Sequence, residues 1–338
     1  MTQERLQLDG EARHGNPSST RFALIEAVRG IAAVLVVFSH TADKSGWFYT
    51  YVFDPGKLGV VVFFFISGYL VIPSAARDGS AYNFLCKRFF RLYPMYWLSL
   101  VLAYLVWSDR LDATDWVANI TMAQQLFGFD NAIDVYWTLT IEFVLYTVIT
   151  AFLVVNPSII LNRFKGVLLV LGLLCVASAM LRWGTQSRIP VAVPLGLFCM
   201  FTGAQMRYEI DAGLSVGKTA IVFSVVAIIS CAFAYSFSTT FSETPSRYII
   251  SYLLGGAVFV LVTHAPYLDF GTPLKALGSV SFGVYLLHKL VIDWLEPYYT
   301  DGLALFLITL IISVIVSAPL YYWYERPLAG YGHKLVKR

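Results

Sequence analysis

The sequence predicts an all-α fold, a polytopic transmembrane helical bundle of about ten spans with both termini in the cytoplasm. Hydrophobic residues make up 58% of its 338 positions and charged residues 13%, whereas a soluble domain has about 45–50% and about 25%. The mean hydropathy is +0.67. Apolar runs of roughly 20 residues, the length that crosses a bilayer, recur from one end of the chain to the other. The lipid bilayer is therefore the first expected partner.

Two regions account for the whole chain. Residues 1–20 are expected to be a flexible cytoplasmic tail, because they are polar and include "HGNPSST". This tail contains acids and no clear small-residue cleavage site follows it, so it does not resemble a signal peptide. Residues 21–338 are expected to form one transmembrane domain, and its apolar windows place spans near 22–42, 57–75, 92–108, 134–155, 166–182, 189–207, 217–236, 247–264, 275–295 and 302–324.

The connections between the spans carry further signals. The basic block "FLCKRFFRLYP" stands before the third span, where Pro94 suits a first-turn position. The longest connection, 109–134, is acidic and is expected to contain a short interfacial helix. No internal repeat is visible, so an inverted-repeat transporter gains no support.

Lysine and arginine set the orientation of the spans. With both termini inside, the inner segments contain sixteen of these residues and the outer loops six, while Arg29 and Lys289 fall within spans. This excess satisfies the positive-inside rule and places connection 109–134 outside.

Composition also excludes several classes of protein. The formal charge of +3 gives no reason to expect nucleic-acid binding. The four cysteines are too scattered for a metal site, and three of them fall within predicted spans. Neither a disulfide nor a metal is therefore expected.

Charged and polar residues within the spans are candidate functional groups. Arg29 and His40 are 11 residues apart, so they share one helix face at roughly 16 Å separation. Glu26 is close enough to pair with Arg29. Alternatively, Arg29 has no function beyond extending its guanidinium to the inner membrane surface, and His40 only packs within the bundle.

Helix depth brings four of these polar groups to one level. With the predicted directions, His40, Ser67, Glu142 and His288 all lie in the central to outer membrane. They predict a buried polar chamber. Nearer the inner face, Lys87, Arg88 and Arg91 interleave with aromatics; they are either a topology signal or a phosphate-binding cluster.

The order and spacing of these motifs resemble those of the membrane-bound acyltransferase 3 family, which includes bacterial O-acetyltransferases of surface polysaccharides. The resemblance covers nearly the whole chain. Its blocks are "RGIAAVLVVFSH" (Arg29, His40), "GVVVFFFISGYL" (Ser67, Gly68), "KRFFRLYP" (Lys87, Arg88, Arg91, Pro94), "YWTLTIEF" (Trp137, Glu142), "LGSVSFGVYLLH" (Ser281, Tyr285, His288) and "YWYERP" (Glu325, Arg326, Pro327).

Two positions depart from the family pattern. Glu26 stands where aspartate is frequent, and Val61 stands where relatives often have an acidic or polar residue. The chain ends soon after its last span, so the extracytoplasmic hydrolase-like domain of some relatives is not expected.

The resemblance implies a membrane-embedded, acyl-CoA-dependent O-acyltransferase of the cell inner (cytoplasmic) membrane. It would move an acyl group, acetyl first, from cytoplasmic acetyl-CoA as co-substrate to a hydroxyl of an extracytoplasmic or membrane-linked carbohydrate such as exopolysaccharide or lipopolysaccharide. Polysaccharide biosynthesis proteins are candidate partners, and no metal is implied.

The resemblance also suggests roles for the residues of the blocks. Arg29, Lys87, Arg88 and Arg91 would bind CoA phosphates. His40 would be the general base, with His288 the next candidate. Glu142 would orient the histidine, and Tyr285 or Ser67 would steady the oxyanion. An acyl-Ser67 intermediate stays open, although no nucleophile-elbow pattern supports it.

Other functions remain as alternatives. The acceptor could be a macrolide or another small hydroxylated molecule. A proton-coupled transporter would also use buried histidines and carboxylates, and a ligand-binding sensory module is a third class. Release of free thiol from acetyl-CoA distinguishes the enzyme from the other two.

The predicted topology can be tested with reporter fusions. Fusions at Ser80 and Thr121 should report opposite sides of the membrane, Ser80 cytoplasmic and Thr121 outside. Activity of an alkaline phosphatase and a green fluorescent protein reporter at each position would measure this. Signals from the same side would contradict the ten-span arrangement.

Overall fold

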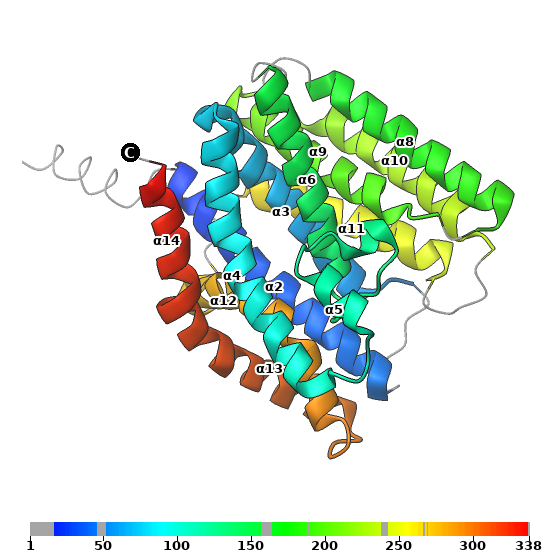
Figure 1. Cartoon of the computed structure of the whole chain (residues 1–338). Coiled ribbons are helices and arrows are strands. Elements are labelled where there is room, and N and C mark those ends of the chain that lie inside the picture. The colour runs from blue at the N-terminus through cyan, green and yellow to red at the C-terminus, as the bar shows by residue number, and fades with distance from the viewer. Residues whose placement is uncertain are drawn as a thin grey trace, which may run out of the picture.

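The computed structural model describes residues 17–45, 52–156, 164–187, 189–237, 243–265, 268 and 270–336. Within these ranges the chain is helical and contains no strand, which confirms the all-α class (Figure 1). The long helices are α2 (Pro17–Ser45), α3 (Pro55–Asp78), α4 (Ala81–Trp107), α6 (Tyr136–Val155), α8 (Phe164–Thr185), α9 (Ala192–Asp211), α10 (Gly217–Tyr235), α11 (Pro245–His264), α12 (Gly271–Leu295) and α13 (Gly302–Leu320).

Nine helices in the described ranges are long and apolar enough to cross a membrane, which confirms the helical membrane bundle. The helix outside this set is α9, at the position of the predicted span 189–207. Gln205, Arg207 and Glu209 make its last third polar. Every residue from Leu195 to Met206 is buried, so α9 is surrounded by protein there and does not need the apolar surface of a lipid-facing helix.

The helix ends correct the sequence-based boundaries in several places. The Ser80 hydroxyl accepts a hydrogen bond from the Asn83 amide at 3.3 Å and caps α4 at Ala81, eleven residues before the predicted start. The basic block therefore lies on α4, and the prediction that Pro94 occupies a first turn is wrong because it lies inside the helix.

The two chain ends and the long connection also contain helix. Helix α2 begins at Pro17, within the predicted tail, and residues 1–16 of that tail lie outside the described residues. After α13 the chain continues through a π-helical turn (Tyr321–Glu325) into α14 (Arg326–Leu335). Connection 109–134 contains the short helix α5 (Ala113–Asn119) and the 3-10 turn η1 (Gln124–Phe127), as expected.

Glycines allow the central helices to approach closely. A Cβ added to Gly68 of α3 would lie 1.7 Å from the carbonyl oxygen of Met200 on α9. A Cβ added to Gly278 of α12 would lie 1.8 Å from the carbonyl oxygen of Glu26 on α2. Membrane helices pack through such small residues, because lipid supplies no hydrophobic driving force between them.

These contacts place α3 at the centre of the bundle. It packs against α2, α9 and α11, and it is the most buried of the nine spans. Figure 1 shows α3 behind α4 and α6. We call the end of the bundle that carries connection 109–134 the loop end; it is tied by ion pairs between Arg110 and Asp293 (3.0 Å) and between Arg247 and Asp54 (3.1 Å).

Gly68→Ala should destabilise the protein, because α3 and α9 must separate to admit a methyl group. Overpacking of this kind costs about 1–3 kcal/mol. The melting temperature of the purified protein in detergent measures the effect. Gly166→Ala on α8, where an added Cβ would meet nothing within 4 Å, is the matched control. Equal melting temperatures for the two variants would show that the close approach does not limit stability.

Candidate active site

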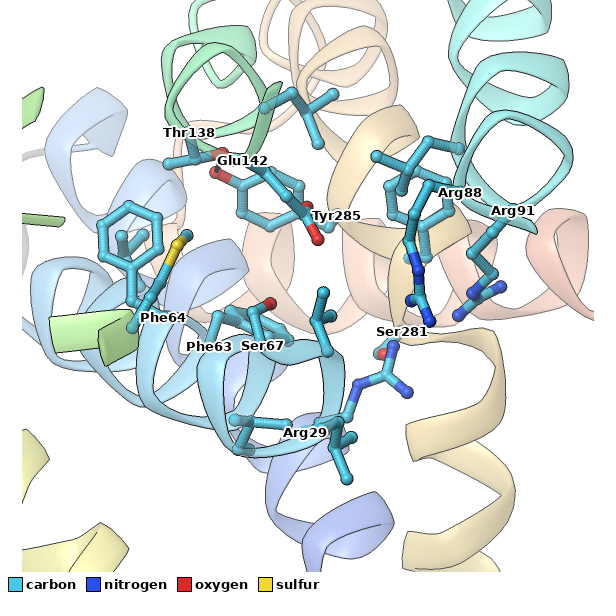
Figure 2. A pocket seen from close by; sticks show the side chains of 18 of the residues that line it. Arg29, Phe63, Phe64, Ser67, Arg88, Arg91, Thr138, Glu142, Ser281 and Tyr285 are labelled. Atoms are coloured by element: carbon cyan, nitrogen blue, oxygen red, sulfur yellow. Dashed lines mark hydrogen bonds between the residues drawn. The ribbon is translucent and has the colours of Figure 1, made fainter. Parts of the chain in front are cut away.

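A cavity of about 160 Å³ lies in the middle of the bundle, and we call it the central cavity. Helices α2, α3, α4, α6, α9 and α12 contribute its walls. Figure 2 shows Arg29, Arg88 and Arg91 gathered near Ser281, with Ser67, Glu142 and Tyr285 across from them. The cavity is thus lined by six of the nine residues singled out in the sequence: Arg29, Ser67, Arg88, Arg91, Glu142 and Tyr285.

The cavity lies deep in the spans. Ser67 is twelve residues into α3 and Arg91 ten residues into α4, which corresponds to about 18 Å and about 15 Å from the first residue of each helix. These helices run in opposite directions, so the cavity is near the middle of the bundle. Charged groups at this depth are costly and are functional candidates.

Most of the cations around the cavity have a carboxylate partner. The Arg29 guanidinium donates to Glu26 at 2.9 Å, the pair expected from the sequence. Arg91 donates to the buried Glu325, next to α14. Lys87 does not line the cavity; its ammonium pairs with Asp78 at 2.7 Å, near the start of α4.

Arg88 differs from these three cations. Among the described residues, no carboxylate lies within ion-pair distance of its guanidinium, and its buried Nε has no hydrogen-bond partner. The guanidinium lies 5.7 Å from the centre of the Phe84 ring. Arg88 is therefore the cation best placed to bind an anionic group that enters the central cavity.

Glu142 and Ser67 reach the cavity from α6 and α3. The Tyr146 hydroxyl, one turn along α6, donates to the Glu142 carboxylate at 2.5 Å. Within the described residues no hydrogen bond joins Glu142 or Ser67 to a histidine. Tyr146, which also lines the cavity, was missed in the sequence because a tyrosine one turn from a glutamate is a weak signal.

His40 and His288 form a pair outside the cavity lining. Their ring centroids are 5.3 Å apart. The Tyr285 ring, on the cavity wall, is 6.0 Å from His288 and is joined to Thr138 by a hydrogen bond of 2.8 Å. The histidines thus lie beside the cavity, nearer the loop end.

The tautomer of His288 follows from its contacts. Its Nδ1 is 2.7 Å from the Tyr285 carbonyl oxygen and 3.2 Å from that of Val284. Carbonyl oxygens only accept, so Nδ1 carries the hydrogen and Nε2 holds the lone pair. That Nε2 is buried and has no hydrogen-bond partner among the described residues.

Asp54 organises the loop end next to His40, and sequence reasoning missed it. Its carboxylate accepts from Ser39 (3.0 Å), Lys57 (2.7 Å) and Arg247 (3.1 Å) and caps α3. Burial alone would raise the pKa of Asp54, but the adjacent Lys57 and Arg247 hold it below its usual value. The sequence "DPG" before an apolar run could have identified Asp54 as a helix cap, because aspartate followed by proline is typical of a helix N-terminus.

Val61, the departure noted above, is buried at the packed side of α3. A Cβ added to Gly255 of α11 would lie 2.6 Å from its Cγ1. The position is filled by helix packing.

Comparison with known proteins identifies similar sequences. Residues 22–322 match the family model described as an acyltransferase domain. The chain is 26% identical to the O-acetyl transferase of Shigella phage Sf6, over 85% of this chain and 90% of that protein. It is 23% identical to O-acetyltransferase OatA of Staphylococcus aureus, over 92% of this chain and 57% of that protein. No solved structure gives a significant match.

Arg88→Gln should weaken binding of CoA, because it removes a cation that no carboxylate neutralises. A charge-assisted contact is worth about 1.5–3 kcal/mol, so the dissociation constant should rise about 10- to 100-fold. Titration calorimetry with CoA would measure it. Lys87→Gln is the control, since Asp78 already neutralises Lys87. Unchanged CoA binding in Arg88→Gln would mean that the basic block acts only as a topology signal.

Proposed function

The chain belongs to the acyltransferase family whose domain model covers residues 22–322, and from this we propose a specific reaction for it. It transfers an acetyl group from cytoplasmic acetyl-CoA to a hydroxyl of an extracytoplasmic or membrane-linked carbohydrate, such as exopolysaccharide or lipopolysaccharide. Similar proteins that are named O-acetyltransferases support acetyl as the group transferred. The nine long apolar helices of the described chain support a multi-pass membrane enzyme.

The central cavity is the observation that carries this proposal. A cavity deep in an apolar bundle, lined by three guanidinium groups, a carboxylate, two serines and two tyrosines, has no packing purpose. Its cations suit a polyanionic donor, and Arg88 is the residue to which we assign the first contact with a phosphate. Arg29 and Arg91, each paired with a glutamate, place further N–H donors at the same level.

The reaction requires a base for the acceptor hydroxyl, and we assign this role to His40. As His40 takes the proton, the hydroxyl oxygen attacks the thioester carbonyl carbon. The carbon–sulfur bond then breaks, and the CoA thiolate leaves and takes up the proton held by His40, which returns the histidine to its neutral form. Tyr285, on the wall between the cavity and the histidine pair, donates to the developing oxyanion.

His288 supports the base from the adjacent position. Its fixed Nδ1–H holds the ring in place and leaves the Nε2 lone pair as a proton acceptor near His40. Glu142, held by Tyr146, contributes negative charge to the cavity rather than a contact with the histidines. A covalent acyl-Ser67 intermediate gains no support, because an activated serine needs an adjacent base.

Mass analysis of surface glycans tests the proposed function. Glycans from cells that express the protein should carry acetyl groups, each of which adds the mass of acetic acid less water. Glycans from cells without the protein should lack these groups. Purified protein should also release free thiol from acetyl-CoA when the de-O-acetylated glycan is supplied. Identical glycans together with no thiol release would contradict the proposal.

His40→Asn should abolish transfer, because asparagine keeps a polar group of similar size but cannot take a proton at neutral pH. General-base catalysis is worth about 100- to 10,000-fold in rate. Thiol release with glycan present measures the rate, and CoA binding shows that the variant is folded. His264→Asn, at an exposed histidine at the end of α11, is the control. If His40→Asn kept more than about a tenth of the rate, a loss below about 1.4 kcal/mol, His40 would not be the base.

A further inference from the structure

A second cavity, of about 370 Å³, lies at the loop end, and we call it the rim cavity. Its volume falls within the roughly 300–1,000 Å³ of small-molecule sites. It lies among the ends of α3, α6, α8, α9, α10 and α11 and the turn η1. The residues that characterise it are four aromatics, three charged groups and an amide: Lys57, Gln125, Trp137, Arg182, Tyr235, Glu243, Tyr248 and Tyr252.

Aromatic rings form one wall of the rim cavity. Tyr235 and Tyr248 stack with ring centroids 3.6 Å apart and planes 9° from parallel. A cation caps each side of this stack, Lys57 at 4.7 Å from the Tyr248 ring and Arg182 at 5.0 Å from the Tyr235 ring. The rings are therefore held rigidly, and because each face is covered by the other ring or by a cation, the stack presents its ring edges and hydroxyls to the cavity.

Each charged group that lines the rim cavity has an ion-pair partner, unlike Arg88 in the central cavity. Lys57 pairs with Asp54 at 2.7 Å, and Arg182 pairs with Glu243 at 3.3 Å. A phosphate would therefore gain little here, whereas Arg88 offers a cation without a carboxylate partner in the central cavity. Paired charges, the Gln125 amide and tyrosine hydroxyls beside the Trp137 ring suit a ligand with hydroxyl edges and an apolar C–H face, which is the chemistry of a sugar ring.

The position of the rim cavity suits an acceptor. Lys57, Trp137 and Tyr248 stand within the first four residues of α3, α6 and α11, at most about 5 Å from the helix starts. The cavity is thus at the bundle rim, where a membrane-linked or dissolved glycan can reach it. Val60 lines both cavities, and Trp137 of the rim cavity meets Phe64 of the central cavity edge to face at 6.2 Å.

We propose that the rim cavity binds a pyranose ring of the carbohydrate acceptor, with its C–H face against the partly exposed Trp137 ring and its hydroxyls toward Gln125, Arg182 and Glu243. This inference rests on the proposed function, because that function makes a carbohydrate the acceptor. The two cavities then separate the substrates by charge, the anionic donor in the centre and the uncharged sugar at the rim.

Binding of a labelled glycan tests the proposal directly. Fluorescent oligosaccharide fragments of de-O-acetylated surface polysaccharide from the expressing cell are titrated into the full chain in detergent, and anisotropy is measured. Val193→Trp, which fills the cavity from α9, and Tyr248→Ala, which removes the stacked ring, should each weaken binding at least tenfold. Val193→Ala, which leaves the cavity open, should bind within about threefold of the unmodified protein. Tyr298→Ala is a second control, because this tyrosine is 74% exposed just after α12, and its binding should also stay within about threefold.

Two outcomes overturn the proposal: fragments that bind Val193→Trp as tightly as the unmodified protein, or fragments that do not bind the unmodified protein at all. Monodisperse elution of each variant confirms that it is folded. Thiol release from acetyl-CoA is measured separately on the unmodified protein with the same polysaccharide. Glycan binding without thiol release would contradict the proposed function and leave the rim cavity as a carbohydrate site.

Discussion

The cost of placing charged groups in the middle of an apolar bundle governs this structure. Three guanidinium groups and a carboxylate surround the central cavity at a depth where lipid could not solvate them. They can exist there because other helices enclose them. Gly68 lets α3 lie directly against α9, and Gly278 lets α12 lie directly against α2. The closest helix contacts are therefore the ones that bring Arg29, Ser67 and Ser281 to the same cavity.

Charge then distinguishes the parts of the site along the membrane normal. Toward the cytoplasmic side predicted from the sequence, Lys87 is neutralised by Asp78. At the centre, Arg88 retains a positive charge that a donor can use. Toward the loop end, Asp54 pairs with both Lys57 and Arg247 beside His40. A polyanionic donor and an uncharged acceptor would prefer different levels, and the histidine pair lies beside the central cavity, nearer the loop end.

Hydropathy and helix periodicity were enough to predict the order of the spans, the Arg29–Glu26 pair and the convergence of Ser67 and Glu142 on one cavity. The same reasoning placed His40 and His288 in that chamber, whereas they form a pair beside it. Features that depend on distant contacts were not predictable. Lys87 belongs to the same basic block as Arg88, and only the fold shows that Asp78 neutralises it. The 193 residues between Asp54 and Arg247 leave no sequence signal for their contact. The start of α4 was missed because Ser80 caps a polar turn that hydropathy excludes.

We propose that the acetyl group crosses the membrane during transfer, and proteoliposomes that hold the protein in one orientation test this most directly. Protein of a single orientation is reconstituted with de-O-acetylated glycan at the loop end, and acetyl-labelled CoA is added only to the opposite face. Label should appear on the glycan while free CoA thiol stays on the side where the donor was added. Transfer that occurs only when donor and glycan share one face would contradict it.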